Sequence, residues 1–168
     1  MDLRIMFVMA VLSAAFVALA VPADKSSAQT AKDIVGTWTL VSNSAEEGGK
    51  KVEPFGANAK GILVLDANGH YIIAVARPGL PRFASDNSMT GTAEENAAVV
   101  RGSNTHFGTY AVDVSGKTIH FRIETSTFAN WDGTEQQRPF SLSGDQLRYT
   151  VAAASGGGTA EVVWKRVK

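Results

Sequence analysis

The sequence predicts an all-β protein: an antiparallel up-and-down barrel of eight to ten strands with one short helix. Short runs of apolar and β-branched residues recur along most of the 168 residues, separated by turn signals. One separator, Asn68-Gly69, is the strongest short-range hairpin signal a sequence can carry. Because an open sheet of consecutive hairpins leaves two exposed edges, closure into a barrel is favoured, with an open sandwich as the alternative.

Composition and charge exclude several classes of protein. The 16 Lys and Arg residues balance the 16 Asp and Glu residues, so no long-range field attracts nucleic acid or an anionic membrane. Cysteine is absent, which excludes disulfides, thiolate metal sites and a cysteine nucleophile. With 45% apolar residues, the chain can bury the core of one domain.

Residues 1–28 are predicted to be a signal peptide. Arg4 precedes an apolar run at residues 5–21, and Ser26-Ser27-Ala28 supplies small residues of the kind found at a cleavage site. Cleavage there leaves residues 29–168 as the barrel domain, without an integral membrane segment. A retained membrane anchor is the alternative, since the run is barely long enough to span a bilayer. Either way, we expect a periplasmic or secreted domain.

The strands follow from two-residue alternation and from the turn residues between them. In the first strand, Gly36, Trp38 and Leu40 share one face. Polar, glycine-bearing residues at 45–60 predict a loop with at most a short edge strand, and Gly156-Gly157-Gly158 is interpreted as a linker. Eight strands are expected, at residues 34–42, 61–66, 70–77, 104–114, 118–127, 135–142, 147–153 and 159–167.

A short helix is expected to begin near Thr92. Threonine followed three residues later by Glu95 is a capping box, in which each side chain accepts from a backbone N–H at the start of the helix. Apolar and alanine residues then continue to Val100.

Several short motifs resemble, in order, those of the lipocalin-like domain family of the calycin superfamily, in its small exported bacterial form. Gly36-Thr37-Trp38 is similar to the Gly-x-Trp motif that opens the first lipocalin strand. The other matching blocks are Pro54-Phe55-Gly56, Gly61-Ile62-Leu63, Asn68-Gly69 with Tyr71, Arg77-Pro78, Gly108-Thr109-Tyr110, Asn130-Trp131 with Gly133, Gln137-Arg138 and Trp164-Lys165-Arg166. The resemblance implies a barrel with a ligand cavity and no particular chemistry.

Two arginines are candidate ligand-binding residues. Arg77 shares parity with Tyr71 and Val75, which places it inside the barrel or at its rim, and Arg138 shares parity with Phe140. A buried arginine keeps its proton and needs an anion, carbonyls or water. If the two converge, they form a fork for a carboxylate. The alternative is pairing with an acidic residue of the protein, or a charged head that reaches the barrel mouth.

Aromatic residues complete the expected ligand site. Tyr71, Tyr110 and Trp131 are candidates for the cavity or its mouth, although core packing is the alternative for each. At the other end, Trp38 is expected to plug the barrel with Arg166 stacked on its ring, because the last strand, which carries Trp164 and Arg166, lies beside the first in a closed barrel. Gly36 belongs to the same closure.

The sequence offers less support for catalytic residues than for ligand-binding residues. His120 and Glu124 alternate with Phe121 and Ile123, so they are expected on the solvated face; turned inward, they would supply a base and a carboxylate. The three histidines lie on separate strands, which gives no support for a metal site, and no cofactor is expected.

These features favour an exported lipocalin-like protein that binds a small hydrophobic or amphipathic molecule, with carboxylate-bearing molecules among the candidates. Two alternatives remain open. One is a cofactor-free isomerase or cyclase that uses the cavity, and the other is an envelope interaction or inhibitor module that acts through apolar loop residues such as Phe55, Pro81 and Phe83.

Overall fold

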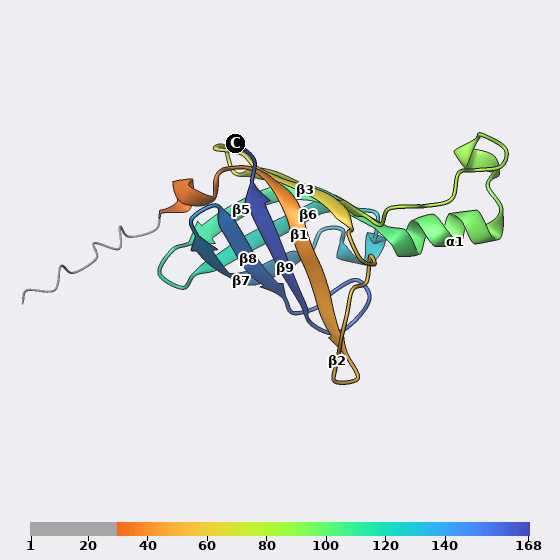
Figure 1. The fold of residues 1–168 in the computed structure, drawn as a ribbon. Coiled ribbons are helices and arrows are strands. Elements are labelled where there is room, and N and C mark those ends of the chain that lie inside the picture. Colours follow the sequence, from red (N-terminus) through yellow and green to blue (C-terminus); the bar gives the residue numbers. More distant parts are fainter. Residues whose placement is uncertain (1–29) are drawn as a thin grey trace, which may run out of the picture.

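The structure is a computed structural model that describes residues 30–168. The predicted signal peptide, residues 1–28, lies outside the described residues. The described residues form nine strands, three 3-10 turns and one α-helix (Figure 1). The strands are β1 (Gly36–Glu47), β2 (Lys50–Val52), β3 (Lys60–Leu65), β4 (His70–Ala76), β5 (Ser103–Asp113), β6 (Thr118–Ser126), β7 (Glu135–Ser143), β8 (Gln146–Val151) and β9 (Ala160–Arg166).

The strands form a closed antiparallel barrel, as predicted. From β3 to β9, each strand pairs with the next in the sequence, and β1 pairs with both β3 and β9. Trp38 lies opposite Arg166 and Ala45 lies opposite Ala160 in the β1–β9 pairing that closes the barrel. Eight strands therefore form the wall, and β2 lies outside it, paired only to the end of β1.

The first strand is longer than the sequence predicts. β1 continues to Glu47 and turns through Gly48 and Gly49 into β2, inside the segment predicted to be mainly a loop. Both glycines have positive φ (57° and 76°), as a two-residue type I′ hairpin turn requires. Pairs of Glu and Lys residues face each other across this hairpin, so its polar composition resembles that of a loop.

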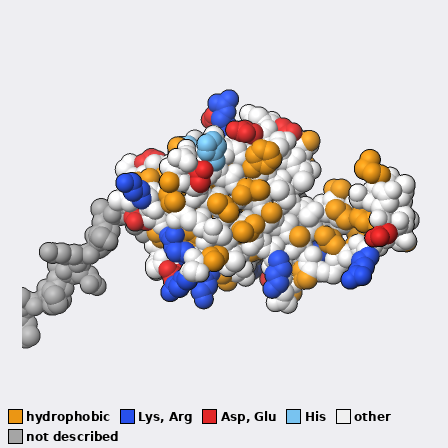
Figure 2. Space-filling view, turned by 90° about the horizontal axis from the view of Figure 1, so that it is seen from above, with side chains coloured by type: hydrophobic (Ala, Val, Ile, Leu, Met, Phe, Trp, Pro, Cys, Tyr) orange, Lys and Arg blue, Asp and Glu red, His pale blue; other side chains and the backbone are white. Residues whose placement is uncertain are grey.

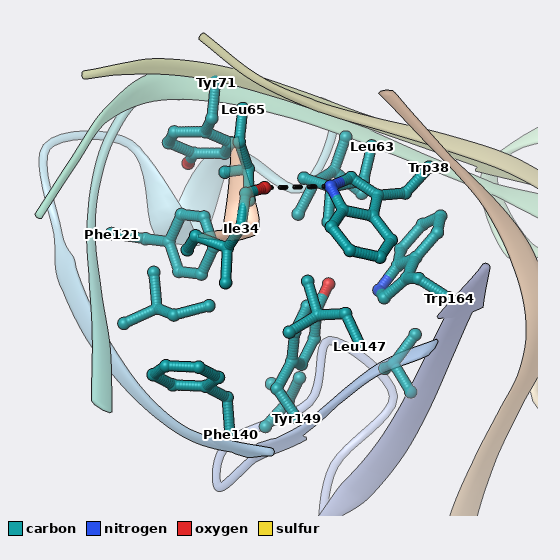
Figure 3. Close-up of a cluster of buried hydrophobic side chains, with 14 of the residues drawn as sticks. Ile34, Trp38, Leu63, Leu65, Tyr71, Phe121, Phe140, Leu147, Tyr149 and Trp164 are labelled. Carbon is teal, nitrogen blue, oxygen red and sulfur yellow. Dashed lines mark hydrogen bonds between the residues drawn. The ribbon is translucent and has the colours of Figure 1, made fainter. Parts of the chain in front are cut away.

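The closed half of the barrel is solidly filled (Figure 3). A 3-10 turn, η1 (Ala31–Ile34), covers this end and buries Ile34, whose carbonyl accepts a hydrogen bond of 3.0 Å from Trp38 Nε1. The side chains beneath it are fully or almost fully buried: Leu63, Leu65, Phe121, Phe140, Leu147 and Trp164. Packing of this kind supplies most of the apolar burial that stabilises the fold.

Residues between β4 and β5 form an arm that extends away from the barrel (Figure 1). It ends in α1 (Ala93–Gly102), which begins with the predicted capping box: Thr92 Oγ1 accepts from Glu95 N at 3.2 Å, and Glu95 Oε2 accepts from Thr92 N at 2.8 Å. The other carboxylate oxygen accepts from Ala84 N at 2.8 Å, which ties the start of the helix to the preceding loop. Apolar side chains are visible both on the arm and on one face of the barrel (Figure 2).

Candidate functional site

A cavity of about 580 Å³ occupies the end of the barrel opposite η1. Its walls come from the second halves of β1, β4 and β8 and from the first halves of β5 and β9, which meet at one end because neighbouring strands are antiparallel. The β1–β2 hairpin, residues 53–55, Trp131 and residues 154–158 surround its mouth. The apolar lining includes Val52, Phe55, Ile73, Val75, Val151 and Val162, and the deeper polar lining is Asn104, His106, Arg138 and Tyr149.

Arg138 is the charged group inside this cavity. Alternation along β7 turns it inward with Phe140, as predicted, and its side chain is 2% exposed. The guanidinium carbon lies 4.6 Å from the centroid of the Phe121 ring and 5.0 Å from that of Tyr149, so aromatic rings cover the cation. Its Nη2 donates to Gln136 Oε1 at 2.8 Å.

The charge of Arg138 is not neutralised within residues 30–168. None of the ion pairs formed there includes Arg138, and its buried Nε has no acceptor in the same part of the chain. Glu46, Glu47 and Glu53 border the cavity, but they are exposed at its mouth, and the first two face lysines across the hairpin. A buried cation without an anion is costly, which makes this arrangement the most informative feature of the cavity.

His106 contributes a second polar group from the neighbouring wall. Its Nδ1 lies 2.9 Å from the hydroxyl of Tyr71, and its ring makes an edge contact with Trp131 at 5.4 Å between centroids. Burial, helped by the positive charge of Arg138, lowers the pKa of His106 to about 3. Burial also raises the pKa of Tyr71 far above its usual value. At neutral pH the cavity is therefore lined by a neutral imidazole that is hydrogen-bonded to the protonated phenol of Tyr71.

Arg77 does not share the cavity with Arg138. Its side chain is exposed near the rim, where Nη2 donates to the carbonyl of Pro54 at 3.3 Å. β4 ends at Ala76, so the alternation that assigned Arg77 to the inner face no longer holds at that residue. The two arginines do not converge, so they form no fork: Arg77 takes the alternative position at the barrel mouth, and Arg138 is the buried arginine of the pair.

The three predicted aromatic residues have different locations. Trp131, in the 3-10 turn η3 (Ala129–Trp131), lines the mouth of the cavity. Tyr71 is buried behind His106 and does not itself line the cavity. Tyr110 lies toward the filled end, where its hydroxyl donates to the carbonyl of Asp66 at 2.7 Å, so it is a structural residue.

His120 and Glu124 are both exposed, while Phe121 and Ile123 take the inner face of β6. Of the two arrangements that the sequence allowed, the structure has the one in which His120 and Glu124 face solvent. They do not form an acid–base pair in the cavity. The predicted stacking at the closed end is present: the guanidinium carbon of Arg166 lies 4.1 Å from the centroid of the Trp38 ring. Trp164, in contrast, also borders the bottom of the cavity.

Sequence reasoning missed Asn104 and His106 as cavity residues and treated residues 156–158 as a linker. The face of β5 that carries Asn104 and His106 continues with Gly108, so no apolar pattern marks it as internal. The glycines form a compact turn, with Gly157 N donating to the carbonyl of Ala154 at 2.8 Å, and this turn borders the mouth. The signal that could have indicated Asn104 and His106 lies in β4, the strand paired with them, because its buried residues alternate regularly.

A closed antiparallel barrel of eight strands, filled at one end and hollow at the other, defines the class of lipocalin-like barrels. The chain belongs to the lipocalin-like domain family, whose profile matches residues 35–167. The 4'-hydroxy-3'-methoxypropiophenone carrier protein ppsC of Aspergillus oryzae (strain ATCC 42149 / RIB 40) is 32% identical over 79 residues, which are 44% of this chain and 71% of that protein.

Solved structures of the fluorescent protein UnaG are also similar. The wild-type structure has a TM-score of 0.38 and 13% identity, and the match covers 82% of this chain and 100% of that one. A single-residue mutant of UnaG gives the same TM-score at 12% identity. None of the described helices is long and apolar enough to cross a membrane.

Proposed function

We propose that this protein binds one small amphipathic molecule in the cavity, with a carboxylate or similar planar oxygen anion of that molecule paired to Arg138. The unneutralised charge of Arg138 carries the proposal. A ligand anion supplies the negative charge that the guanidinium lacks, and the aliphatic and aromatic walls take up the apolar part of the molecule.

The volume and shape of the cavity support a carrier or sequestering role. A hollow of about 580 Å³ lies within the range of small-molecule sites, whereas an interaction module that worked through its loops would not need one. The relative from Aspergillus oryzae is named as a carrier of an aryl ketone that also bears a phenol. Aryl ketones and phenols therefore belong in the set of molecules to be tested beside carboxylic acids.

Binding can be followed through the fluorescence of Trp131 and Trp164, which border the cavity. The purified domain is titrated with long-chain fatty acids, aromatic acids, phenolic aryl ketones and the uncharged methyl esters of the acids. We expect saturable quenching by acids, with about tenfold or greater loss of affinity for the esters, because a hydrogen bond to a charged group contributes about twice the free energy of a neutral one. Absence of saturable binding by any amphipathic acid would overturn the proposal.

A pair of arginine variants isolates the role of the buried charge. Arg138→Met keeps an unbranched side chain of similar length and removes the cation, so it should abolish the preference for acids over esters. Arg148→Met, on the neighbouring strand, removes an exposed arginine that is paired with Glu161 at 2.6 Å, and it should leave binding unchanged. Equal effects of the two variants would show that net charge, and not the site, determines affinity.

Export is a further part of the proposal, based on the apolar segment and the small residues that follow it in the sequence. Expression of the full chain in a bacterial host should release a mature protein that begins at Gln29 into the periplasm or medium. N-terminal sequencing of the fractionated protein checks this expectation, and an intact N-terminus on a membrane-bound product would indicate a retained anchor instead.

A further inference from the structure

His106 places a second hydrogen-bonding group in the cavity, on a different strand from Arg138. We infer that the bound molecule carries, besides its anion, a neutral oxygen acceptor of the ketone, ester or amide type that accepts a hydrogen bond from His106 Nε2. This inference rests on the proposed function and narrows the ligand class to oxo-substituted amphipathic acids.

The hydrogen bond between Tyr71 and His106 decides which imidazole nitrogen carries the proton. The hydroxyl of Tyr71 is buried, keeps its proton and forms its single hydrogen bond within residues 30–168 to His106 Nδ1, at 2.9 Å. If Nδ1 carried the proton and donated to Tyr71, the hydroxyl hydrogen would be left buried without an acceptor, which is unfavourable. The network therefore assigns the proton to Nε2.

The Nε2–H group is then free to recognise a ligand. The ring is 3% exposed and borders the cavity, and among the described residues Nε2 forms no hydrogen bond. Burial and the charge of Arg138 keep the imidazole neutral, so it acts as a hydrogen-bond donor and not as a second cation. A neutral donor favours a neutral oxygen, whereas the anion goes to the arginine.

Trp131 and Tyr71 fix the orientation of this donor. Trp131 contacts the imidazole ring edge-on, at an interplanar angle of 85°, and Tyr71 holds the opposite nitrogen while its own ring packs against Phe121 at 4.6 Å between centroids. A donor held on two sides loses little conformational entropy on binding, which increases its contribution to selectivity. Tyr71 is thus a positioning residue, and His106 makes the contact.

Matched pairs of acids test the inference by isothermal titration calorimetry. The pairs are 4-acetylbenzoate with 4-isopropylbenzoate, and 4'-acetylbiphenyl-4-carboxylate with its isopropyl counterpart, which differ in the carbonyl but hardly in shape. We expect at least one ketone to bind about three to tenfold more tightly than its partner, the range for one neutral hydrogen bond. In His106→Leu that ratio should fall to one, while the isopropyl acid retains its affinity.

Two further single variants and one double variant serve as controls for this test. His120→Leu replaces an exposed histidine on the outer face and should preserve the ratio. Tyr71→Phe should reduce the ratio and allow both imidazole tautomers, which 15N NMR distinguishes. If His106→Leu fails to fold because it leaves the Tyr71 hydroxyl unpaired, the double variant with Tyr71→Phe removes that group as well.

The outcomes separate this inference from the proposed function. If the members of each pair bind equally to the native protein, or if a ketone preference survives in His106→Leu, the contact with His106 is overturned and the role of Arg138 stands. If neither member of either pair binds and no other acid does, the proposed function itself fails.

Discussion

The guanidinium of Arg166 covers the ring of Trp38 at the closed end of the barrel and joins the last strand to the first. Arg166 Nη1 also donates to the carbonyl of Val35 at 2.7 Å, and Nη2 donates to that of Asp33, while Trp38 Nε1 donates to Ile34. One arginine and one tryptophan therefore hold η1 over the end of the barrel. The cavity lies at the other end, so we expect stability and ligand binding to depend on different halves of the molecule.

Replacement of Trp38 tests this division. Trp38→Ala removes a fully buried aromatic side chain, so it should lower the free energy of unfolding by about 3–5 kcal/mol, measured by urea denaturation. Ligand affinity of the folded fraction should stay within about twofold, because Trp38 does not border the cavity. A selective loss of binding at unchanged stability would contradict the assignment of Trp38 to closure.

Gly36 leaves room for the same arginine. Its φ of 140° is one that other residues rarely adopt, and a Cβ atom there would lie 2.8 Å from Arg166 Nη1. Gly36→Ala should destabilise the fold by about 1–3 kcal/mol. Gly144→Ala is the control: φ is also positive, at 55°, but no atom lies within 4 Å of the added methyl group. We expect the Arg166→Met background to reduce the cost of Gly36→Ala and to leave that of Gly144→Ala unchanged.

Much of the closed half could be predicted from sequence because its signals are local and repeated. Alternation identified the inward faces that carry Trp38, Phe121 and Phe140, and the hairpin signal at Asn68-Gly69 fixed the pairing of β3 with β4. Barrel closure requires the first and last strands to be neighbours, and this requirement alone places Arg166 near Trp38.

The cavity was harder to predict because its polar residues depend on contacts between distant strands. Arg138 was identified by its parity alone, since an arginine on an apolar face is unusual in itself. His106 becomes informative only beside Tyr71, 35 residues away, and of the two positions predicted for Arg77 the structure has the rim, because β4 ends at Ala76. Local sequence patterns do not show which residues of distant strands come into contact.

The capping box of α1 should stabilise the arm and not the barrel. Thr92→Ala removes the hydroxyl that accepts from Glu95 N, at a cost of about 0.5–2 kcal/mol to the helix. Because the arm extends away from the barrel (Figure 1), hydrogen exchange should accelerate at residues 93–100 while amides of β3 to β9 keep their protection. Thr105→Ala, within β5, is a control for the loss of a threonine hydroxyl outside the helix. Uniform acceleration across the barrel would show that the arm and the barrel unfold together.

The lowered pKa of His106 predicts how the free energy of unfolding depends on pH. Its pKa is lowered to about 3 in the folded protein, whereas the unfolded chain keeps a histidine pKa of about 6.5. Below pH 6.5 the unfolded chain therefore binds a proton that the folded chain does not, and stability falls as pH decreases toward 3, by up to about 1.4 kcal/mol per pH unit. Urea denaturation between pH 5 and 6.5 isolates this effect, because the lowered pKa values of Asp66, Glu95, Asp113 and Asp145 act at lower pH.

Replacement of His106 provides the control for that measurement. His106→Gln retains a hydrogen-bonding side chain but cannot titrate, so the slope of stability against pH should nearly disappear between pH 5 and 6.5. His120→Gln, at the exposed outer face of β6, should leave the slope as it is in the native protein. A slope that persists in His106→Gln would assign it to another group.

The charge of Arg138 should cost stability in the empty protein and supply affinity in the bound one. Arg138→Met removes a buried cation that has no acidic partner in residues 30–168 and keeps apolar contact with Phe121 and Tyr149. Replacement of buried charges by apolar side chains is often neutral or stabilising by about 1–4 kcal/mol. Without ligand, we expect the variant to be at least as stable as the native protein in urea denaturation.

With a saturating acid the order should reverse, because ligand binding stabilises only a protein that binds it. The native protein should gain stability in proportion to the logarithm of ligand concentration, and Arg138→Met should gain almost none. If the empty variant instead lost more than about 2 kcal/mol, the arginine would be a structural residue held by its two aromatic neighbours. The unneutralised charge would then no longer indicate a ligand, because the fold itself would require it.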